Sequence, residues 1–337
     1  MTTFYAAWNR DKRVLADSTS GGVFSALAAP VLASGGIVVG AAYGKGLCVE
    51  HQVAHDENEL ARLRGVKYVF STVGKAVYDE MATALAAGRR VLFVGTPCQA
   101  AGIRKRFGSP QNLLVCDLVC FGTPSQEIWL KYVDWLERRN GKRLVCISPR
   151  DKAKGWGRVT YYRYEWADGS VTRQCSRYDP YASAFYSTLA FRSYCFGCRF
   201  RGIERVSDLT LCDMWNAEAL HLPRTTLRGG VSGVMVHTTA GSDAFGAADV
   251  ERLPVAQDVF LEGNFPILRS ADRPATWAAF NADAAILPFD RLVRKYGLQR
   301  TQVGYAWQRV VRMAKRVIAS LLPQKMRVAL ERILRHG

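Results

Sequence analysis

The chain has 337 residues, of which 49% are hydrophobic and 22% are charged, and this composition is typical of a folded protein and excludes a disordered body. Its formal net charge is +17, and residues 301–337 contribute seven of these charges through eight basic residues and one acidic residue. A basic field of this size favours acidic partners such as anionic lipid, nucleic acid, a phosphorylated cofactor or an acidic electron carrier.

Cysteine usage and hydropathy bear on the compartment. Nine cysteines in a long chain without a signal-peptide pattern favour a reducing, cytoplasmic environment. Residues 21–43 carry no charge and raise the question of a transmembrane helix, but Pro30 and the repeated glycines argue against one. We instead expect a helix to about Ser34, a break at Gly35 and a buried strand.

The first 120 residues alternate between predicted strands and helices. After an N-terminal strand, the expected helices cover 20–34, 57–65, 75–87 and 100–107, and the expected strands cover 37–41, 91–94 and 113–119. This βαβ alternation predicts parallel strands.

The second half adds antiparallel structure. Ser125 is a predicted cap of an amphipathic helix that stops near Gly141. Alternating aromatic and polar residues around Asp168-Gly169 predict a β-hairpin. The remaining expected elements are a helix over 181–194 and strands over 144–148, 208–212 and 233–237. The fold class is therefore mixed α/β, a parallel βαβ core with an added antiparallel hairpin and a smaller N-terminal α/β subdomain.

Four cysteines stand in contexts suited to one metal or cluster. Cys98 and Cys120 each follow a predicted strand, and ligands collect beyond the carboxyl ends of parallel strands. Cys195 and Cys198 form a Cys-x-x-Cys pair that can chelate. Thiolates in this number suit either zinc or an iron–sulfur cluster, and the wide spacing places the site within the main fold. The alternative is that these are buried apolar cysteines.

Two further cysteines are harder to assign. Cys116 would lie too far from Cys120 to share a compact cluster if the strand continued to Cys120, and it is interpreted as a core residue. Cys212 lies at the end of a predicted strand and is kept as a reserve ligand.

An ordered series of segments resembles the coenzyme F-420 hydrogenase/dehydrogenase beta-subunit family of flavin and iron–sulfur proteins. The resemblance runs from Tyr5 to Tyr296 and rests on segments 5–8, 18–24, 65–71, 94–99, 117–122, 149–156, 192–198, 208–215 and 230–232. It implies FAD, one 4Fe-4S cluster on Cys98, Cys120, Cys195 and Cys198, and oxidoreductase activity. It also implies an N-terminal family subdomain over 1–82, a flavin and iron–sulfur domain over 83–297 and a tail over 298–337.

The flavin contacts implied by the resemblance lie in three places. Ser20, Gly21 and Gly22 begin a helix and suit a pyrophosphate. Lys67 and Tyr68 are expected near the flavin ring or phosphate. The two turns at Gly95-Thr96 and Gly122-Thr123 offer amides to cluster sulfur or flavin oxygen.

Departures from the family pattern also carry information. Val66 replaces a small polar residue, Phe121 replaces a common histidine, and Cys212 to Trp215 replaces a Gly-Asp-Phe-Trp pattern. The chain lacks the cysteine-rich, ferredoxin-like segment of many relatives, which implies an external ferredoxin-like electron donor. This short form resembles the polysaccharide-associated branch most, which implies a small-molecule or glycan-precursor substrate, and direct use of the deazaflavin is less expected.

The C-terminal tail has a helical pattern with two faces. The apolar positions are Trp307, Val310, Val311, Ala314, Val317, Ile318 and Leu321, and the basic ones are Arg309, Arg312, Lys315 and Arg316. An anionic membrane surface explains this pattern, which would place the protein peripherally at the inner membrane, and docking on a partner explains it equally well.

Arg150, Lys152 and Trp156 follow a predicted strand and suit an anionic substrate or cofactor, although a solvated loop explains them equally well. Two rival interpretations of the whole chain remain. One is a zinc-stabilised, basic nucleic-acid-binding protein, although no nucleic-acid motif accompanies the charge and nucleic acid is not the expected partner. The other is a non-catalytic scaffold of the same fold.

Overall fold

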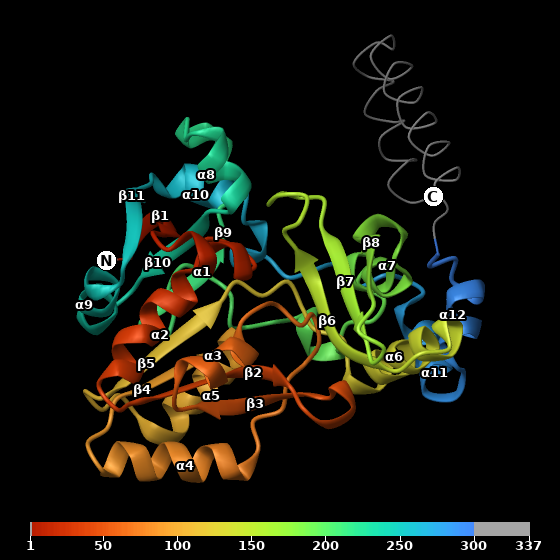
Figure 1. The fold of residues 1–337 in the computed structure, drawn as a ribbon, viewed down its shortest axis with the longest axis horizontal. Helices are drawn as coiled ribbons and strands as arrows, with labels where there is room; N and C mark the ends of the chain where they lie inside the picture. The colour runs from red at the N-terminus through yellow and green to blue at the C-terminus, as the bar shows by residue number, and fades with distance from the viewer. Residues whose placement is uncertain (1, 300–337) are drawn as a thin grey trace.

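The computed structural model describes residues 2–299, which form one large mixed sheet and one small antiparallel sheet (Figure 1). The large sheet has eight strands in the order β11-β1-β10-β9-β5-β4-β2-β3, and the small sheet has the order β6-β7-β8. The strands are β1 Thr3–Asn9, β2 Ile37–Tyr43, β3 Val49–Ala54, β4 Val91–Gly95, β5 Leu113–Leu118, β6 Leu144–Asp151, β7 Tyr161–Trp166, β8 Val171–Cys175, β9 Leu209–Asp213, β10 Ser232–Val236 and β11 Val250–Pro254.

Helices cover both faces of the large sheet and flank the small one. Their bounds are α1 Lys12–Asp17, α2 Val23–Ala33, α3 Glu57–Leu63, α4 Lys75–Ala86, α5 Pro97–Phe107, α6 Gln126–Asn140, α7 Pro180–Tyr186, α8 Arg224–Gly229, α9 Thr239–Ala247, α10 Gln257–Glu262, α11 Trp277–Ile286 and α12 Phe289–Lys295. The mixed α/β prediction is confirmed. Strands β2, β4, β5 and β9 are parallel neighbours, and β7 and β8 form the predicted hairpin.

The parallel strands are largely apolar because the sheet is buried on both faces. Along β4, Leu92 and Val94 face the helices α2, α3 and α9, whereas Val91 and Phe93 face α4 and α5. Successive side chains of a strand point to opposite faces, so a strand with helices on both sides needs a continuous apolar run. The strands β1, β2 and β3 of residues 1–82 all belong to this sheet, and β1 and β2 pair with strands from later in the chain.

The small sheet packs on α6, α7 and α12 around an aromatic core. Trp129 and Tyr132 of α6 contact Tyr181 of α7, with ring centroids 5.1 and 4.9 Å apart. The buried Asp179 accepts hydrogen bonds from Tyr132 (2.6 Å) and Tyr164 (2.9 Å). This network fixes the start of α7, which leads towards the Cys-x-x-Cys segment.

The sequence-based elements differ from the structure after α7. The expected helix over 181–194 ends at Tyr186, because Thr188 has a φ of 62° and Phe191 forms an antiparallel bridge with Pro124. These contacts are distant in sequence, and no local periodicity reveals them. The strands β3 and β11 were not predicted.

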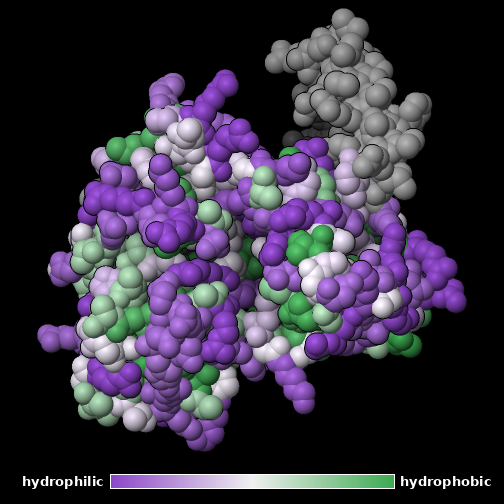
Figure 2. Space-filling view, in the orientation of Figure 1, coloured by the Kyte–Doolittle hydropathy of each residue, from purple (hydrophilic) through white to green (hydrophobic). Residues whose placement is uncertain are grey.

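Polar and charged side chains cover most of the face in Figure 2, with smaller apolar areas between them. Within residues 2–299, no helix is both long enough and apolar enough to span a bilayer. The amphipathic pattern predicted for residues 301–337 lies outside the described residues.

His51 on β3 makes the fold sensitive to acid. Its ring is buried, stacks on Phe93 at 5.2 Å and lies 3.2 Å from the Val94 carbonyl oxygen through Nε2. Burial lowers the pKa of His51 from 6.5 to about 4. The unfolded chain therefore binds a proton between these pH values that the folded chain does not bind, and stability falls as the pH falls through this window.

We expect His51→Gln to remove this dependence. The slope of the unfolding free energy between pH 6.5 and 4 should decrease by about 1.4 kcal/mol per pH unit. Urea unfolding at several pH values measures the slope. The control is His55→Gln, because His55 is exposed and its substitution should leave the slope unchanged. An unchanged slope in His51→Gln would show that the imidazole does not remain neutral in the fold.

Candidate iron–sulfur site

Cys98 and Cys120 come together because β4 and β5 are parallel and in register. Gly95 at the end of β4 pairs with Asp117 of β5, so both strands deliver their following loops to the same edge of the sheet. Cys98 is exposed in the first turn of α5, and Thr96 caps that helix. The Thr96 Oγ1 lies 3.2 Å from the Cys98 Sγ. The positive end of the α5 dipole therefore lies beside this sulfur.

A short antiparallel bridge brings Cys195 to the same edge. Phe191 pairs with Pro124, and the Arg192 N–H donates to the Thr123 carbonyl at 3.1 Å. The chain then turns through a short 3-10 helix that ends at Cys195. The Cys195 Sγ lies 3.9 Å from the Thr123 Oγ1. The bridge thus carries the third thiol to the loop that holds Cys120.

The thiols influence one another electrostatically. Burial, together with the thiols of Cys195 and Cys98, raises the pKa of Cys120 to about 12, whereas Arg201 and the Gly122 N–H act to lower it. The register of β4 and β5 and the bridge between Phe191 and Pro124 place these three residues at one edge of the sheet. The structure therefore brings three of the four predicted ligands into one neighbourhood.

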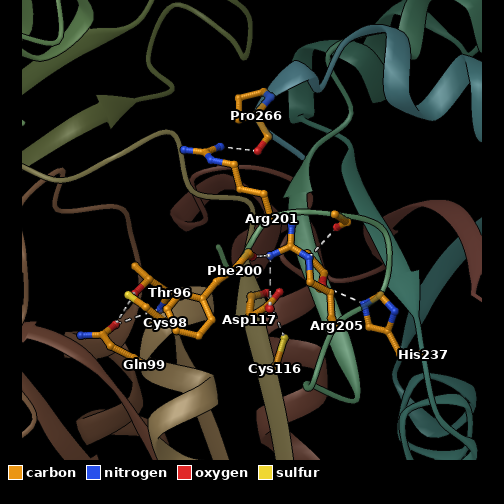
Figure 3. Close-up of polar contacts among 12 residues, drawn as sticks. Thr96, Cys98, Gln99, Cys116, Asp117, Phe200, Arg201, Arg205, His237 and Pro266 are labelled. Atoms are coloured by element: carbon orange, nitrogen blue, oxygen red, sulfur yellow. Dashed lines mark hydrogen bonds and ion pairs between the residues drawn. The ribbon is translucent and has the colours of Figure 1, made fainter. Parts of the chain in front are cut away.

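Cys198 joins this neighbourhood through its backbone. Its N–H donates to Ser270 Oγ at 3.2 Å, and Arg201 Nε donates to the same oxygen at 3.1 Å. Arg201 also donates to the Phe121 carbonyl at 3.0 Å and to the Pro266 carbonyl. Figure 3 shows Arg201 and its contact with Pro266 above the end of β5. Cys98 lies to one side of that strand end, at the start of α5. Arg201 therefore ties the Cys198 segment to the Cys120 loop.

The donor set fits an iron–sulfur cluster in its chemistry. All four cysteines are free thiols, and the hydroxyl oxygens of Thr96 and Thr123 lie 3.2 and 3.9 Å from the sulfurs of Cys98 and Cys195. Within residues 2–299 no group of three or more His, Cys, Asp or Glu side chains is arranged around a single metal ion. Ligands of a four-iron cluster bind different iron atoms, so they lie farther apart than the ligands of one ion.

The two remaining cysteines near these strands have other contacts. Cys116 is fully buried among the apolar residues of the sheet, as its interpretation as a core residue requires. The Cys212 thiol donates to the Gly233 carbonyl at 3.7 Å, and burial raises its pKa. The reserve ligand is therefore directed at a neighbouring strand.

The predicted pyrophosphate segment is held tightly by the protein itself. The Ser20 hydroxyl donates to the Val231 carbonyl at 3.0 Å, and the Gly21 N–H donates to Ser232 Oγ at 2.9 Å. Gly22 is the N-cap of α2, and no side chain accepts a hydrogen bond from the first N–H groups of this helix. These N–H groups are therefore available to donate to a ligand. These donors suit an anionic group, but the hollow beside them measures about 10 Å³. A dinucleotide needs this face to open.

Lys67 and Tyr68 have structural contacts of their own. The Lys67 ammonium lies 2.8–3.4 Å from the carbonyl oxygens of residues 62–65 at the end of α3, so its donors are occupied. Burial lowers the pKa of Lys67 to about 7. Tyr68 has a φ of 52°, and its ring packs on Phe185 at 4.6 Å. In this conformation Lys67 caps a helix.

The two glycine turns use their donors differently. The Thr96 N–H donates to Gln99 Oε1 at 2.9 Å and completes a capping box, so only the Thr96 hydroxyl reaches a sulfur. A Cβ on Gly95 would lie 2.8 Å from the Phe93 ring, which explains the glycine there. The Gly122 N–H acts to lower the pKa of Cys120 against the larger, opposing effect of burial. The donation of these amides to cluster sulfur or flavin oxygen stays a prediction.

A second polar group joins the two sheets. Arg150 of β6 forms a buried ion pair with Asp213 of β9, and Trp156 Nε1 donates to the same carboxylate at 3.0 Å. Trp156 stacks on Trp215 with centroids 5.4 Å apart. Lys152 donates to the Ser20 carbonyl at 2.7 Å, so it clamps the start of α2. The sequence singled out Arg150 and Trp156 but missed their dependence on Asp213.

Two family models match the chain. Both describe the coenzyme F420 hydrogenase/dehydrogenase beta subunit, and the model of its N-terminal part matches residues 4–77, whereas the model of its C-terminal part matches residues 88–257. The chain belongs to this family, and its fold and thiol-bearing loops are in keeping with an oxidoreductase-related, electron-transfer role.

One solved structure is similar over most of its length. A chain of the F420-reducing NiFe hydrogenase complex from Methanosarcina barkeri, studied as a xenon derivative, is 18% identical with a TM-score of 0.49. The match covers 87% of this chain and 90% of that chain. No curated protein matches the chain.

Gly122 provides a test of the Cys120 loop. Its φ is +148°, and a Cβ built on it would lie 2.3 Å from the Phe191 ring. We expect Gly122→Ala to destabilise the fold by about 1–3 kcal/mol, because the loop and the ring must separate. Gly102→Ala is the control, since its Cβ meets nothing within 4 Å inside α5. Urea unfolding measures both variants, and equal stabilities would contradict the close packing of this loop.

Proposed function

We propose that this chain is an oxidoreductase that holds one 4Fe-4S cluster on Cys98, Cys120, Cys195 and Cys198 and passes electrons between a one-electron carrier and a two-electron substrate. The observation that carries the proposal is the position of Cys98, Cys120 and Cys195 at one sheet edge, with the Cys198 segment tied to the Cys120 loop through Arg201. Family membership supports the chemistry. A four-iron cluster bound there supplies single-electron transfer.

The residues around the thiols suit an anionic centre. Burial raises the pKa of Cys120, and Arg201 and the Gly122 N–H oppose that rise. The start of α5 presents its positive dipole end to Cys98. Hydrogen bonds to sulfur stabilise added negative charge and so raise a reduction potential. The apolar side chains of Phe121, Phe185 and Phe191 pack together beside Cys195.

We further propose FAD as the two-electron partner, a cofactor that supplies hydride chemistry when bound. The α2 N-terminus at Gly22 would hold an anionic phosphate, and Arg150 and Trp156 line a small hollow together with Thr19. The substrate class that we favour is a glycan precursor, handled in the cytosol. Purification without oxygen tests the flavin, because flavin released on denaturation supports it and its consistent absence rejects it.

Cys120→Ser tests the cluster. We expect anaerobic reconstitution to give about four irons and four sulfides per wild-type chain. The variant should lose most of this content and the broad iron–sulfur absorbance, because serine replaces a central thiolate. Cys175→Ser is the control, since Cys175 lies on β8 and outside the proposed ligand set. Iron, sulfide and zinc analysis is the measurement.

Two results would reject the cluster, and a third would change its ligand set. Stoichiometric zinc without sulfide would favour a zinc protein, and a metal-free wild type would favour a scaffold. Equal iron and sulfide in Cys120→Ser and wild type would remove Cys120 from the site.

A further inference from the structure

A cavity of about 380 Å³ lies directly against the proposed cluster site. Residues that line it include Phe121, Tyr186, Phe265, Arg269, Ser270 and Arg273. Phe121 follows Cys120, and Ser270 Oγ accepts the N–H of Cys198 at 3.2 Å. One wall of the cavity is therefore the protein layer that surrounds the thiols.

The rim of this cavity combines exposed apolar side chains with unpaired cations. Tyr186 is 52% exposed and Phe265 is 43% exposed. Arg269 stacks over Phe265 at 5.3 Å, and Arg273 lies 4.8 Å from the Trp277 ring centroid. Neither arginine forms an ion pair with a carboxylate within residues 2–299. Stacking on rings orders both guanidinium groups without neutralising them.

We propose that this rim is the docking surface of an acidic, one-electron carrier protein, an inference that rests on the proposed function. The rings provide a small apolar centre, and Arg269 and Arg273 provide complementary charge to acidic side chains of the carrier. Interfaces of this kind are small and rely on electrostatic steering. In the transfer, the reduced carrier loses one electron and the cluster on the four thiols gains it, with no bond made or broken.

The position of the charges favours a protein over a small anion. Both arginines and Asp272 are exposed at the rim, and both arginines are held by rings. A site for a small anion encloses its ligand with convergent polar groups. A partner protein can reach these charges because they are exposed at the rim of the cavity. The thiols lie directly behind the cavity wall that Phe121 and Ser270 form.

Charge reversal tests the surface in the full-length protein. In the variant Arg269→Glu/Arg273→Glu, we expect the dissociation constant for an acidic two-cluster ferredoxin to rise at least about tenfold at low ionic strength. The control Lys75→Glu/Lys105→Glu carries the same charge change on α4 and α5 and should bind as the wild type does. Calorimetry measures binding, and stopped-flow reduction of the loaded protein measures the electron-transfer rate.

A milder variant guards against misfolding. Arg269→Gln/Arg273→Gln removes the charges without adding like charge near the apolar side chains, and an intermediate affinity is expected. Unfolding midpoints of all variants are compared with that of the wild type. Equal ferredoxin affinity in the wild type and both rim variants would overturn the proposal.

Two further outcomes separate the possibilities. Loss of inorganic phosphate binding in the rim variants, with ferredoxin binding unchanged, would overturn the protein partner and assign a small anion. Calorimetry with cluster-free protein makes the test independent of the proposed function. If the protein binds ferredoxin through this rim but takes up no iron, the docking surface stands and the cluster is rejected. If it takes up iron but does not bind ferredoxin through this rim, the cluster stands and the docking surface is rejected.

Discussion

The site depends on the parallel pairing of β4 and β5. Because Gly95 lies opposite Asp117, the loops that follow the two strands begin at the same level of the sheet. A register shift of one residue would turn the buried side chains of each strand to the other face, where they would not fit. The alternating apolar residues of both strands, packed against helices on both faces, therefore fix the relative positions of Cys98 and Cys120.

The third and fourth thiols depend on contacts of a different kind. The bridge between Phe191 and Pro124 is isolated, and it is supported by the aromatic rings that pack around Phe191. Arg201 adds a polar link from the Cys198 segment to the Phe121 carbonyl. Burial makes a charged Cys120 unfavourable unless cations or N–H groups compensate it. The same residues that bring the loops together thus also supply the positive field that thiolates need.

Local sequence patterns predicted the elements that depend on local physics. The continuous apolar runs predicted β4 and β5, and Ser125 with Gly141 bounded α6 because a cap and a left-handed stop are local features. The Asp168-Gly169 turn predicted the β7–β8 hairpin for the same reason. The convergence of the loops after β4 and β5 followed from the parallel alternation alone. Contacts between distant residues were not predictable in this way: the end of α7 at Tyr186 is set by the bridge at Phe191, and Arg201 and Ser270 were missed because they meet only in space.

Tyr68 connects the two polar regions of the molecule. Its ring packs on Phe185, which in turn contacts Phe121 and Phe191 beside the thiols. On its other side, Tyr68 is close enough to Arg150 and Asp213 for their charges to affect its pKa, which burial raises. A neutral, half-buried phenol between an ion pair and an aromatic layer adds no charge to either side. Aromatic rings therefore lie between the thiols and the Arg150 group, and the two regions remain adjacent.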